Sequence, residues 1–362
     1  MKICLNRIGA WGDVLVVTPL IRYLKQQGNE MYVLTSEETG AQILQHNPYI
    51  DKIIPYPKDS IPMDLFGKFL KSTQEAYGCQ RLIDMNESIE CTLALNPQDP
   101  QYNYTKAERL AMCNKNYYDY AFEFAGENVT NSTGRGEVFF TQEEEEWAED
   151  FLYTLKQKGR FLLLWGLSGS GRNKAYPAAE VVIKDLLDKY KDIVIITVGD
   201  DVCQILEPKL QSSRIAYLCG QTTYRQSMLL TKYVNLVVAP DTGLLHSAGC
   251  FTTPKVGLFG HSTKENVTKY FENDFSIEAD CACAPCMRLI YNAAIQCPID
   301  PRTRGCWCMT YGLKATRVYE HICGVIERSY YSDRRAEGDR KIIVPGGERV
   351  VGAKQDGLLI HS

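Results

Sequence analysis

Short apolar runs alternate with amphipathic helical stretches along this 362-residue chain, and the alternation constrains its fold more than any other feature. In the first half, apolar runs occupy residues 2–7, 31–34, 53–54 and 81–85. A helical stretch ends near Gly28, where helices commonly stop. Strands that alternate with helices form parallel sheets with helices on both faces. We therefore predict a doubly wound α/β architecture.

The same alternation restarts after a helix expected to begin at Thr141. Thr141-Gln-Glu-Glu144 has the capping-box pattern, and its acidic first turn suits the positive end of the helix dipole. This helix is expected to stop by Gly159, and we place the boundary between two domains there. The prediction is a Rossmann-like N-terminal domain over residues 1–158 and a second Rossmann-like domain over residues 159–330.

The second domain continues the alternation of strands and helices. Its expected strands cover residues 161–165, 193–197, 235–239 and 255–259, and its expected helices cover residues 178–190 and 314–328. Ligands of doubly wound sheets bind outside the carboxyl ends of the strands, so two such domains predict a site in the cleft between them. The tail, residues 331–362, is expected to be either a small hairpin or a disordered segment.

Composition argues against several classes of protein. The formal net charge of -4 argues against a nucleic-acid binder with a broad basic surface. No apolar run of the sequence approaches the ~20 residues needed to span a bilayer. The first residues are typical of a short strand and not of a secretory signal, so we expect a cytoplasmic protein.

The first of four strand-to-helix junctions suited to chemistry is Arg7-Ile-Gly-Ala-Trp-Gly-Asp13. Gly12 lets the backbone approach a ligand closely. Asp13 would open the following helix and face the cleft, where a carboxylate can act as general base on an acceptor hydroxyl. An aspartate in this position also caps helices, and the local pattern leaves both roles open.

The second junction is rich in groups that bind phosphate. Gly166-Leu-Ser-Gly-Ser-Gly-Arg-Asn-Lys174 follows an expected strand, but it is not a Walker A motif, because Arg and Asn follow its last glycine. Its amides, the hydroxyls of Ser168 and Ser170, and the ammonium group of Lys174 suit a diphosphate. An ordinary flexible loop is the alternative.

The third and fourth junctions complete a candidate nucleotide site. In Val198-Gly-Asp-Asp201, either Asp200 or Asp201 suits ribose hydroxyls, although solvated acids are common in such loops. In Ala239-Pro-Asp-Thr-Gly-Leu-Leu-His246, a helix would begin with amides directed at an anion. The expected donor-binding residues here are Asp241, Thr242, Gly243, Leu244 and His246. A lone histidine is usually structural, but this one adjoins the expected diphosphate.

Six of the fourteen cysteines crowd into one segment near the end of the second domain, residues 281–308. They are Cys281, Cys283, Cys286, Cys297, Cys306 and Cys308. Four thiolates in such a stretch can bind zinc tetrahedrally, Cys283 and Cys286 have the spacing of a half-site, and iron also accepts soft ligands. A structural zinc or iron ion held by a subset of them is therefore expected, with disulfides or reduced buried thiols as the competing interpretations.

Taken together, the junctions resemble the heptosyltransferases, glycosyltransferase family 9, which have the GT-B fold. The resemblance covers roughly residues 1–330 and rests on three pieces in order. These are Gly12-Asp13-Val-Leu with Thr18-Pro19, Gly166-Leu-Ser168 leading to Lys174 and Pro177, and Asp241-Thr-Gly-Leu-Leu-His246 followed by Val256-Gly-Leu-Phe-Gly260. The sequence departs from the family at Lys174-Ala-Tyr-Pro177, where a Trp-Pro pair is common.

The resemblance implies an inverting transfer from a nucleotide sugar, usually ADP-heptose, in lipopolysaccharide or other glycan biosynthesis, without a catalytic metal. It implies that Asp13 is the base and that Arg7 and Gly12 lie near the acceptor. It also implies that Gly166, Ser168, Lys174 and the Asp241–His246 segment hold the donor. Some members of the family carry an iron site near the position of the cysteine-rich segment.

The acceptor stays open among a glycan, a lipid-linked sugar and a protein. Two other functions also stay open: a different nucleotide-sugar enzyme of the same fold, such as an epimerase, and a non-catalytic nucleotide-sugar binder.

Overall fold

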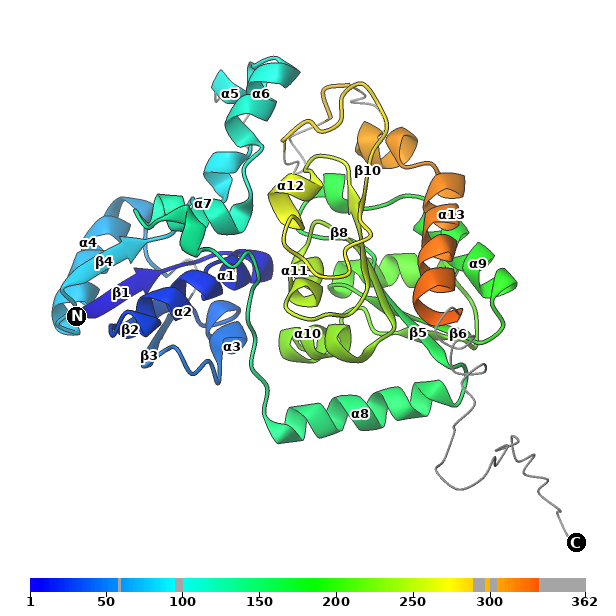
Figure 1. Ribbon diagram of the computed structural model, residues 1–362, viewed down its shortest axis with the longest axis horizontal. Helices are drawn as coiled ribbons and strands as arrows, with labels where there is room; N and C mark the ends of the chain where they lie inside the picture. Colours follow the sequence, from blue (N-terminus) through cyan, green and yellow to red (C-terminus); the bar gives the residue numbers. More distant parts are fainter. Residues whose placement is uncertain (58–59, 95–99, 289–296, 300–304, 332–362) are drawn as a thin grey trace, which may run out of the picture.

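The computed structural model describes residues 1–57, 60–94, 100–288, 297–299 and 305–331 (Figure 1). The chain builds two parallel β-sheets with helices packed around them, and this confirms the predicted GT-B arrangement of two Rossmann-like halves. Apart from its first residue, the predicted tail over residues 331–362 lies outside the described residues.

The N-terminal sheet has four parallel strands in the order β3-β2-β1-β4. They are β1 (Lys2–Asn6), β2 (Glu30–Ser36), β3 (Lys52–Tyr56) and β4 (Arg81–Asp84), and all four coincide with predicted apolar runs. The flanking helices are α1 (Trp11–Val16), α2 (Thr18–Gln26), α3 (Gly40–Leu44) and α4 (Met63–Ala76). The predicted first helix is in fact two helices, α1 and α2, since Pro19 is tolerated only in the first turn of a helix.

The C-terminal sheet has six parallel strands in the order β10-β9-β8-β5-β6-β7. They are β5 (Phe161–Gly166), β6 (Ile193–Val198), β7 (Ile215–Tyr217), β8 (Leu236–Pro240), β9 (Lys255–Phe259) and β10 (Ile277–Glu278). The four central strands are the predicted ones and are buried on both faces. The edge strands β7 and β10 escaped prediction because two or three residues are too short to show a periodicity.

Helix α8 (Gln142–Lys156) precedes the helices of the C-terminal half, which are α9 (Ala179–Lys189), α10 (Tyr224–Tyr233), α11 (Gly243–Gly249), α12 (Lys264–Val267) and α13 (Ala315–Ile326). The predicted capping box of α8 is confirmed, because Thr141 Oγ1 accepts from the Glu144 amide at 3.3 Å and Glu144 Oε2 accepts from the Thr141 amide at 2.9 Å. Helix α8 lies along α10 (Figure 1), and Arg225 of α10 pairs with Glu144. In the described ranges, no helix combines the length and apolar character needed to cross a membrane.

Helices α5 (Pro100–Asn103) and α6 (Lys106–Cys113) follow β4 and project beyond the N-terminal sheet (Figure 1). We call residues 100–113 the arm. Helix α7 (Tyr117–Phe124) returns the chain to the N-terminal half. The arm reaches toward the cysteine-rich segment of the other half and binds it through Lys106 and Arg109.

The two halves contact each other directly along α1 and α11. Val14 and Leu15 of α1 belong to the same buried hydrophobic cluster as Leu244 of α11. The Trp11 indole Nε1 donates to Ser247 Oγ across this seam at 2.9 Å. The carboxyl ends of the two sets of strands therefore face each other at short range.

Candidate functional site

A cavity of about 830 Å³ lies between the two halves, at the carboxyl ends of strands from both sheets. The sequence-predicted residues that line it are Gly12, Asp13, Gly166, Ser168, Lys174, Asp200, Asp241, Thr242, Gly243, Leu244 and His246. Segments far apart in the sequence are thus brought to one cavity, as the strand ends of two doubly wound sheets require. Arg7 and Asp201 do not line it.

Asp13 lies in the first turn of α1 and keeps 27% of its side chain exposed to the cavity. Its Oδ2 accepts a hydrogen bond from the Ala10 amide at 2.8 Å, which caps the helix. The same oxygen lies 3.5 Å from Arg7 Nη2. The two roles that the sequence left open are therefore compatible, because one carboxylate caps the helix and lines the cleft.

Arg7 lies behind Asp13 with only 1% of its side chain exposed. Its guanidinium forms a two-pronged pair with Glu90, at 3.2 Å and 3.1 Å, and donates to the Met85 carbonyl at 2.8 Å. Burial opposes the charge of Arg7, but the carboxylates of Asp13 and Glu90 outweigh it and raise its pKa. Arg7 is thus placed to contact Asp13, while Glu90, which sequence reasoning missed, lines the cavity.

The loop after β5 supplies the opposite wall. Ser168, Gly169, Ser170 and Lys174 line the cavity, and the Lys174 amide donates to the Gly171 carbonyl at 2.8 Å. A Cβ atom added at Gly169 would lie 2.4 Å from Thr242 Cγ2 and 3.1 Å from Lys174 Cδ. Only a glycine lets this loop approach the start of α11 so closely, so the two predicted phosphate-binding segments form one surface.

Asp241 is buried beneath this surface, with its carboxylate between two histidines. His246 Nε2 lies 3.6 Å from Asp241 Oδ1, and His261 Nε2 lies 3.4 Å from Asp241 Oδ2. Burial alone raises the pKa of this carboxyl, but the charge of Lys174 and the two imidazoles hold the pKa well below its usual range. An anionic Asp241 therefore anchors the cationic side of the cavity.

His261 was missed by the sequence analysis. It follows β9 by two residues, so it lies at the same carboxyl edge as the four junctions. That position is the signal that could have found it, because strand-end side chains of a parallel sheet converge.

The start of α11 is also held by residues of the N-terminal half. The Tyr118 hydroxyl lies 3.3 Å from His246 Nδ1, and the Tyr117 ring stacks on the imidazole with the ring centres 6.1 Å apart. Burial raises the pKa of Tyr117 well above its usual value, with Asp241 and Asp13 contributing, so its hydroxyl stays protonated. The Thr242 hydroxyl is buried and has no hydrogen-bond partner among the described residues.

Two glycines set how closely the halves approach. A Cβ atom at Gly12 would lie 2.9 Å from His246 Cδ2, and one at Gly243 would lie 2.5 Å from the Trp11 ring. A larger residue at either position would push α1 and α11 apart. Gly12 therefore serves the contact between the halves as well as lining the cavity.

The structure distinguishes the two candidate ribose-binding acids. Asp200 lines the cavity, and its Oδ1 accepts from the Cys203 amide at 3.0 Å. Asp201 is exposed outside the cavity, and its Oδ1 accepts from the Val202 amide at 3.1 Å. The sequence analysis missed four further lining residues on this side, which follow the unpredicted strand β7: Thr222, Thr223, Tyr224 and Ser227.

Five of the six clustered cysteines come together away from the cavity. The sulfurs of Cys281, Cys283 and Cys308 all lie within 4.8 Å of one another, with Cys283 and Cys308 at 3.3 Å. Cys286 and Cys306 also contact Cys308, and the hydrogen bond from Cys308 lowers the pKa of Cys286. Soft sulfur ligands at this spacing fit zinc or iron.

Cys297 lies apart from this group. It is buried and packs against Ala94 and Tyr102. The expected metal-binding subset therefore excludes Cys297. All fourteen cysteines are free thiols in the structure.

The sequence matches the model of glycosyltransferase family 9 (heptosyltransferase) over residues 106–292, slightly more than half of the chain. No match to a curated protein was found.

The solved structures that share the fold include the following three. The ADP-heptose lipopolysaccharide heptosyltransferase II of E. coli has 14% identity and a TM-score of 0.63, over 91% of this chain and 99% of that one. The iron-containing dodecameric glycosyltransferase TibC of enterotoxigenic E. coli has 12% identity and a TM-score of 0.58, over 91% and 79%. The E. coli heptosyltransferase WaaC with ADP has 15% identity and a TM-score of 0.52, over 91% and 100%.

Proposed function

Because this chain belongs to glycosyltransferase family 9 and is a glycosyltransferase, we propose that it moves a sugar from a nucleotide-sugar donor to an acceptor hydroxyl with inversion. The observation that carries the proposal is the shared cavity. Asp13 comes to it from one half, and Lys174 and the start of α11 come from the other. We also propose the division into residues 1–158 and 159–330, with α8 as the connecting helix.

In this mechanism Asp13 is the general base. Its Oδ2 is engaged by the Ala10 amide and by Arg7, so we assign proton removal to Oδ1. As the acceptor oxygen loses its proton, it forms a bond to the anomeric carbon from the face opposite the leaving group. The bond from that carbon to the diphosphate oxygen breaks, and its electron pair leaves with the nucleoside diphosphate.

The leaving diphosphate is stabilised by the donor wall. Lys174 supplies a full positive charge, and the amides of the 166–171 loop and of Thr242–Leu244 supply fixed dipoles. The unpartnered Thr242 hydroxyl is suited to a phosphate oxygen. Asp241 contributes by pairing with His246 and by attracting the positive charge of Lys174, since a buried carboxylate facing the diphosphate directly would repel it.

We favour ADP-heptose as the donor. The family match and the solved relatives support this, because WaaC is described with ADP and TibC in complex with ADP-D-β-D-heptose. Asp200 is the acid we assign to the ribose hydroxyls, because it lines the cavity and Asp201 does not. The free thiols fit a reducing compartment, which supports a cytoplasmic reaction.

We also propose a structural metal in the cysteine group and no metal in the reaction. Cys281, Cys283 and Cys308 would supply three thiolates, and Cys286 or Cys306 would supply the fourth. A zinc or iron ion held in this way fixes the loops that carry its ligands. The iron named for TibC supports the assignment.

Asp13→Asn tests the function. We expect the variant to bind ADP as the wild type does and to lose transfer by about 10²- to 10⁴-fold, the range for general-base removal. Transfer is measured as nucleotide release with and without acceptor, and ADP binding is measured by titration calorimetry. Full transfer by the variant would overturn the base assignment. A wild-type protein that binds ADP-sugar but neither transfers nor hydrolyses it would instead be a binder, and an isomerised donor would indicate an epimerase.

A further inference from the structure

We propose that residues 281–288, which we call the cysteine loop, position the donor site when their thiolates hold a metal ion. The cysteine loop contacts the phosphate loop, the strand-end residue His261 and the arm of the other half. The inference rests on the proposed function, because it assigns residues that hold the donor-binding groups in place. Each of these contacts is made by the backbone of the cysteine loop or of its neighbour in space.

The first contact reaches the phosphate loop. Asn173 immediately precedes Lys174 and has an exposed fraction of only 1%. Its side-chain Nδ2 donates to the Arg288 carbonyl at 3.0 Å. A buried amide bond of this kind fixes the backbone on either side of it. The position of Lys174 therefore depends on where the cysteine loop ends.

The second contact reaches the buried carboxylate beneath the donor wall. The Met287 amide donates to the His261 carbonyl at 2.8 Å, and the His261 ring faces Asp241. Gly260, the residue before His261, packs against Cys308, one of the proposed metal ligands. A Cβ atom at Gly260 would lie 3.2 Å from Cys308 Cβ. His261 is thus held between the cysteine loop and Cys308.

The third contact joins the cysteine loop to the arm. Arg109 Nε donates to the Cys286 carbonyl at 2.8 Å, and Lys106 Nζ donates to the carbonyls of Ala282, at 3.0 Å, and of Ala284. In the reverse direction, Arg288 Nε donates to the Tyr102 carbonyl at 3.0 Å. Cations of the arm therefore bind carbonyls that point outward from the cysteine loop.

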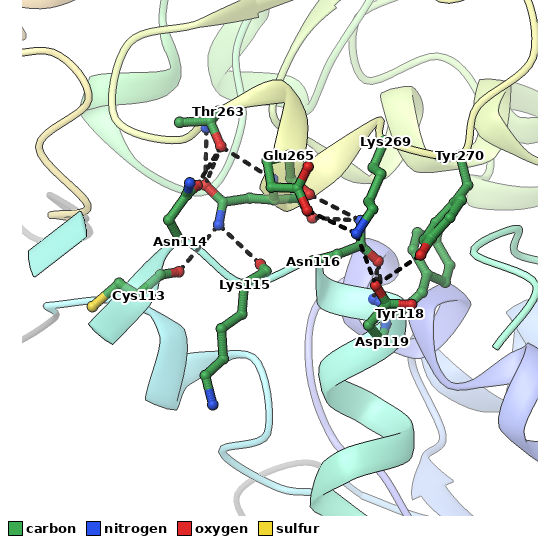
Figure 2. A network of polar contacts seen from close by, with 11 residues as sticks. Cys113, Asn114, Lys115, Asn116, Tyr118, Asp119, Thr263, Glu265, Lys269 and Tyr270 are labelled. Carbon is green, nitrogen blue, oxygen red and sulfur yellow. Dashed lines mark hydrogen bonds and ion pairs between the residues drawn. The ribbon is translucent and has the colours of Figure 1, made fainter. Parts of the chain in front are cut away.

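A second seam holds the base of the arm to the segment just after His261 (Figure 2). Thr263 Oγ1 donates to Asn114 Oδ1 at 2.6 Å. Asn266 Nδ2 donates to the carbonyls of Cys113 and Lys115, at 3.1 Å and 2.9 Å. His261 consequently lies on a segment that is tied to the N-terminal half on one side and to the cysteine loop on the other.

A metal would supply the order that these contacts need. Ordering a loop costs conformational entropy for every residue, and metal binding to thiolates offsets this cost. An ion bound to the thiolates of Cys281 and Cys283 would fix the backbone between and beside them, and with it the carbonyls of Ala282, Ala284 and Cys286 that the arm contacts. Metal binding and donor binding should therefore be coupled, each favouring the other.

The test compares metal-loaded protein with protein treated with 1,10-phenanthroline, using metal content, ADP affinity by calorimetry and amide hydrogen exchange. We expect metal removal to weaken ADP binding by at least about fivefold, the lower end of usual coupling between sites. We also expect faster exchange at residues 100–113 and 172–174. Asn173→Ala should keep the metal, fold normally and weaken ADP binding similarly, while Lys184→Ala, an exposed helix position, should change neither.

Three outcomes separate the alternatives. Equal ADP affinity and equal exchange with and without metal would overturn the inference. Protein that contains no metal when isolated and takes up neither zinc nor iron would also overturn it. If metal-loaded protein does not bind ADP but exchange in the arm still depends on the metal, the proposed donor is wrong and the positioning role of the cysteine loop stands.

Discussion

The two walls of the cavity differ in how they obtain their charge. On the N-terminal wall, two carboxylates, Asp13 and Glu90, share the single buried guanidinium of Arg7. On the C-terminal wall, Lys174 and the backbone amides at the start of α11 provide positive potential, and one buried carboxylate, Asp241, lies beneath them. The N-terminal wall is built from ionisable side chains, and the C-terminal wall is built mainly from backbone dipoles of fixed orientation.

This difference matches the two tasks of a displacement. A base has to accept a proton, so its charge must be free to change. A leaving diphosphate gains negative charge, and it is stabilised best by groups that are already oriented and need no rearrangement. Variants that alter one wall should therefore produce effects distinct from variants that alter the other.

Among the variants that compare the two walls, Lys174→Ala should have the largest effect on kcat. Removing a cation from the donor wall is expected to lower kcat by about 10²- to 10³-fold, as the loss of a transition-state stabiliser does. The binding of ADP should also weaken. Steady-state kinetics measure the change, and Lys184→Ala serves as the control because that lysine makes an exposed pair with Glu180. Normal kcat in Lys174→Ala would remove this residue from the donor wall.

Asp241→Asn should reduce the free energy of unfolding by about 2 kcal/mol at pH 7, since Lys174 and the two imidazoles lose the buried carboxylate that they face. The folded pKa of Asp241 is depressed, so its contribution is present above about pH 4, the ordinary value, and is lost as the pH falls through the folded value. Between pH 5 and 3, the free energy of unfolding of the variant should therefore fall less than that of the wild type. The difference should correspond to the contribution of one buried carboxylate. Urea unfolding from pH 7 to pH 3 measures the free energy of unfolding and its pH dependence for both proteins. If this free energy depended on pH in the same way in the variant and the wild type, the prediction would be wrong.

Glu90→Gln should lower kcat/KM by about tenfold. With Glu90 neutral, Asp13 is left as the ion-pair partner of Arg7, whose charge draws the Asp13 carboxylate toward it and away from the acceptor. Steady-state kinetics measure the loss, and Glu90→Asp, which keeps the negative charge, should recover part of it, unlike a purely structural change. Tyr117 and Asp84 also face this pair and are unchanged in the variant. Glu123→Gln, at an exposed pair, is the control.

Trp11→Phe should have the smallest effect. The variant loses the hydrogen bond from Nε1 to Ser247 but keeps an aromatic ring against Gly243. We expect a loss of about 1 kcal/mol in the free energy of unfolding and a change of less than about threefold in kcat. Thermal unfolding measures the first. A much larger loss of activity would show that the seam between the walls, and not the walls themselves, limits transfer.

The sequence predicted the elements that have a clear period or a clear end signal. The four central strands of the C-terminal sheet, the capping box at Thr141 and the strand-end loops all follow from local pattern. The edge strands β7 and β10 do not, because they exist only through pairing with β6 and β9. The lining residues that follow β7, Thr222 to Tyr224, were missed for the same reason.

Within the site, residue type and position along the chain indicated Asp13, Lys174 and the Asp241–His246 segment. They did not indicate Glu90, His261 or Tyr117, which have no local motif. Each reaches the site through a partner that is distant in sequence: Arg7 for Glu90, Asp241 for His261, and His246 for Tyr117. Which of two adjacent acids faces the cavity was likewise a question of loop geometry.

The sequence by itself determined the α/β class, the two halves and the chemical character of each loop, because periodicity and strand-end glycines act locally. Only the tertiary structure decided that Arg7 lies behind Asp13, that Cys297 lies apart from the other clustered cysteines, and that the cysteine loop contacts the arm. Those relations depend on the close packing of α1 against α11 and of the cysteine loop against Ala94 and the arm, which no local pattern encodes.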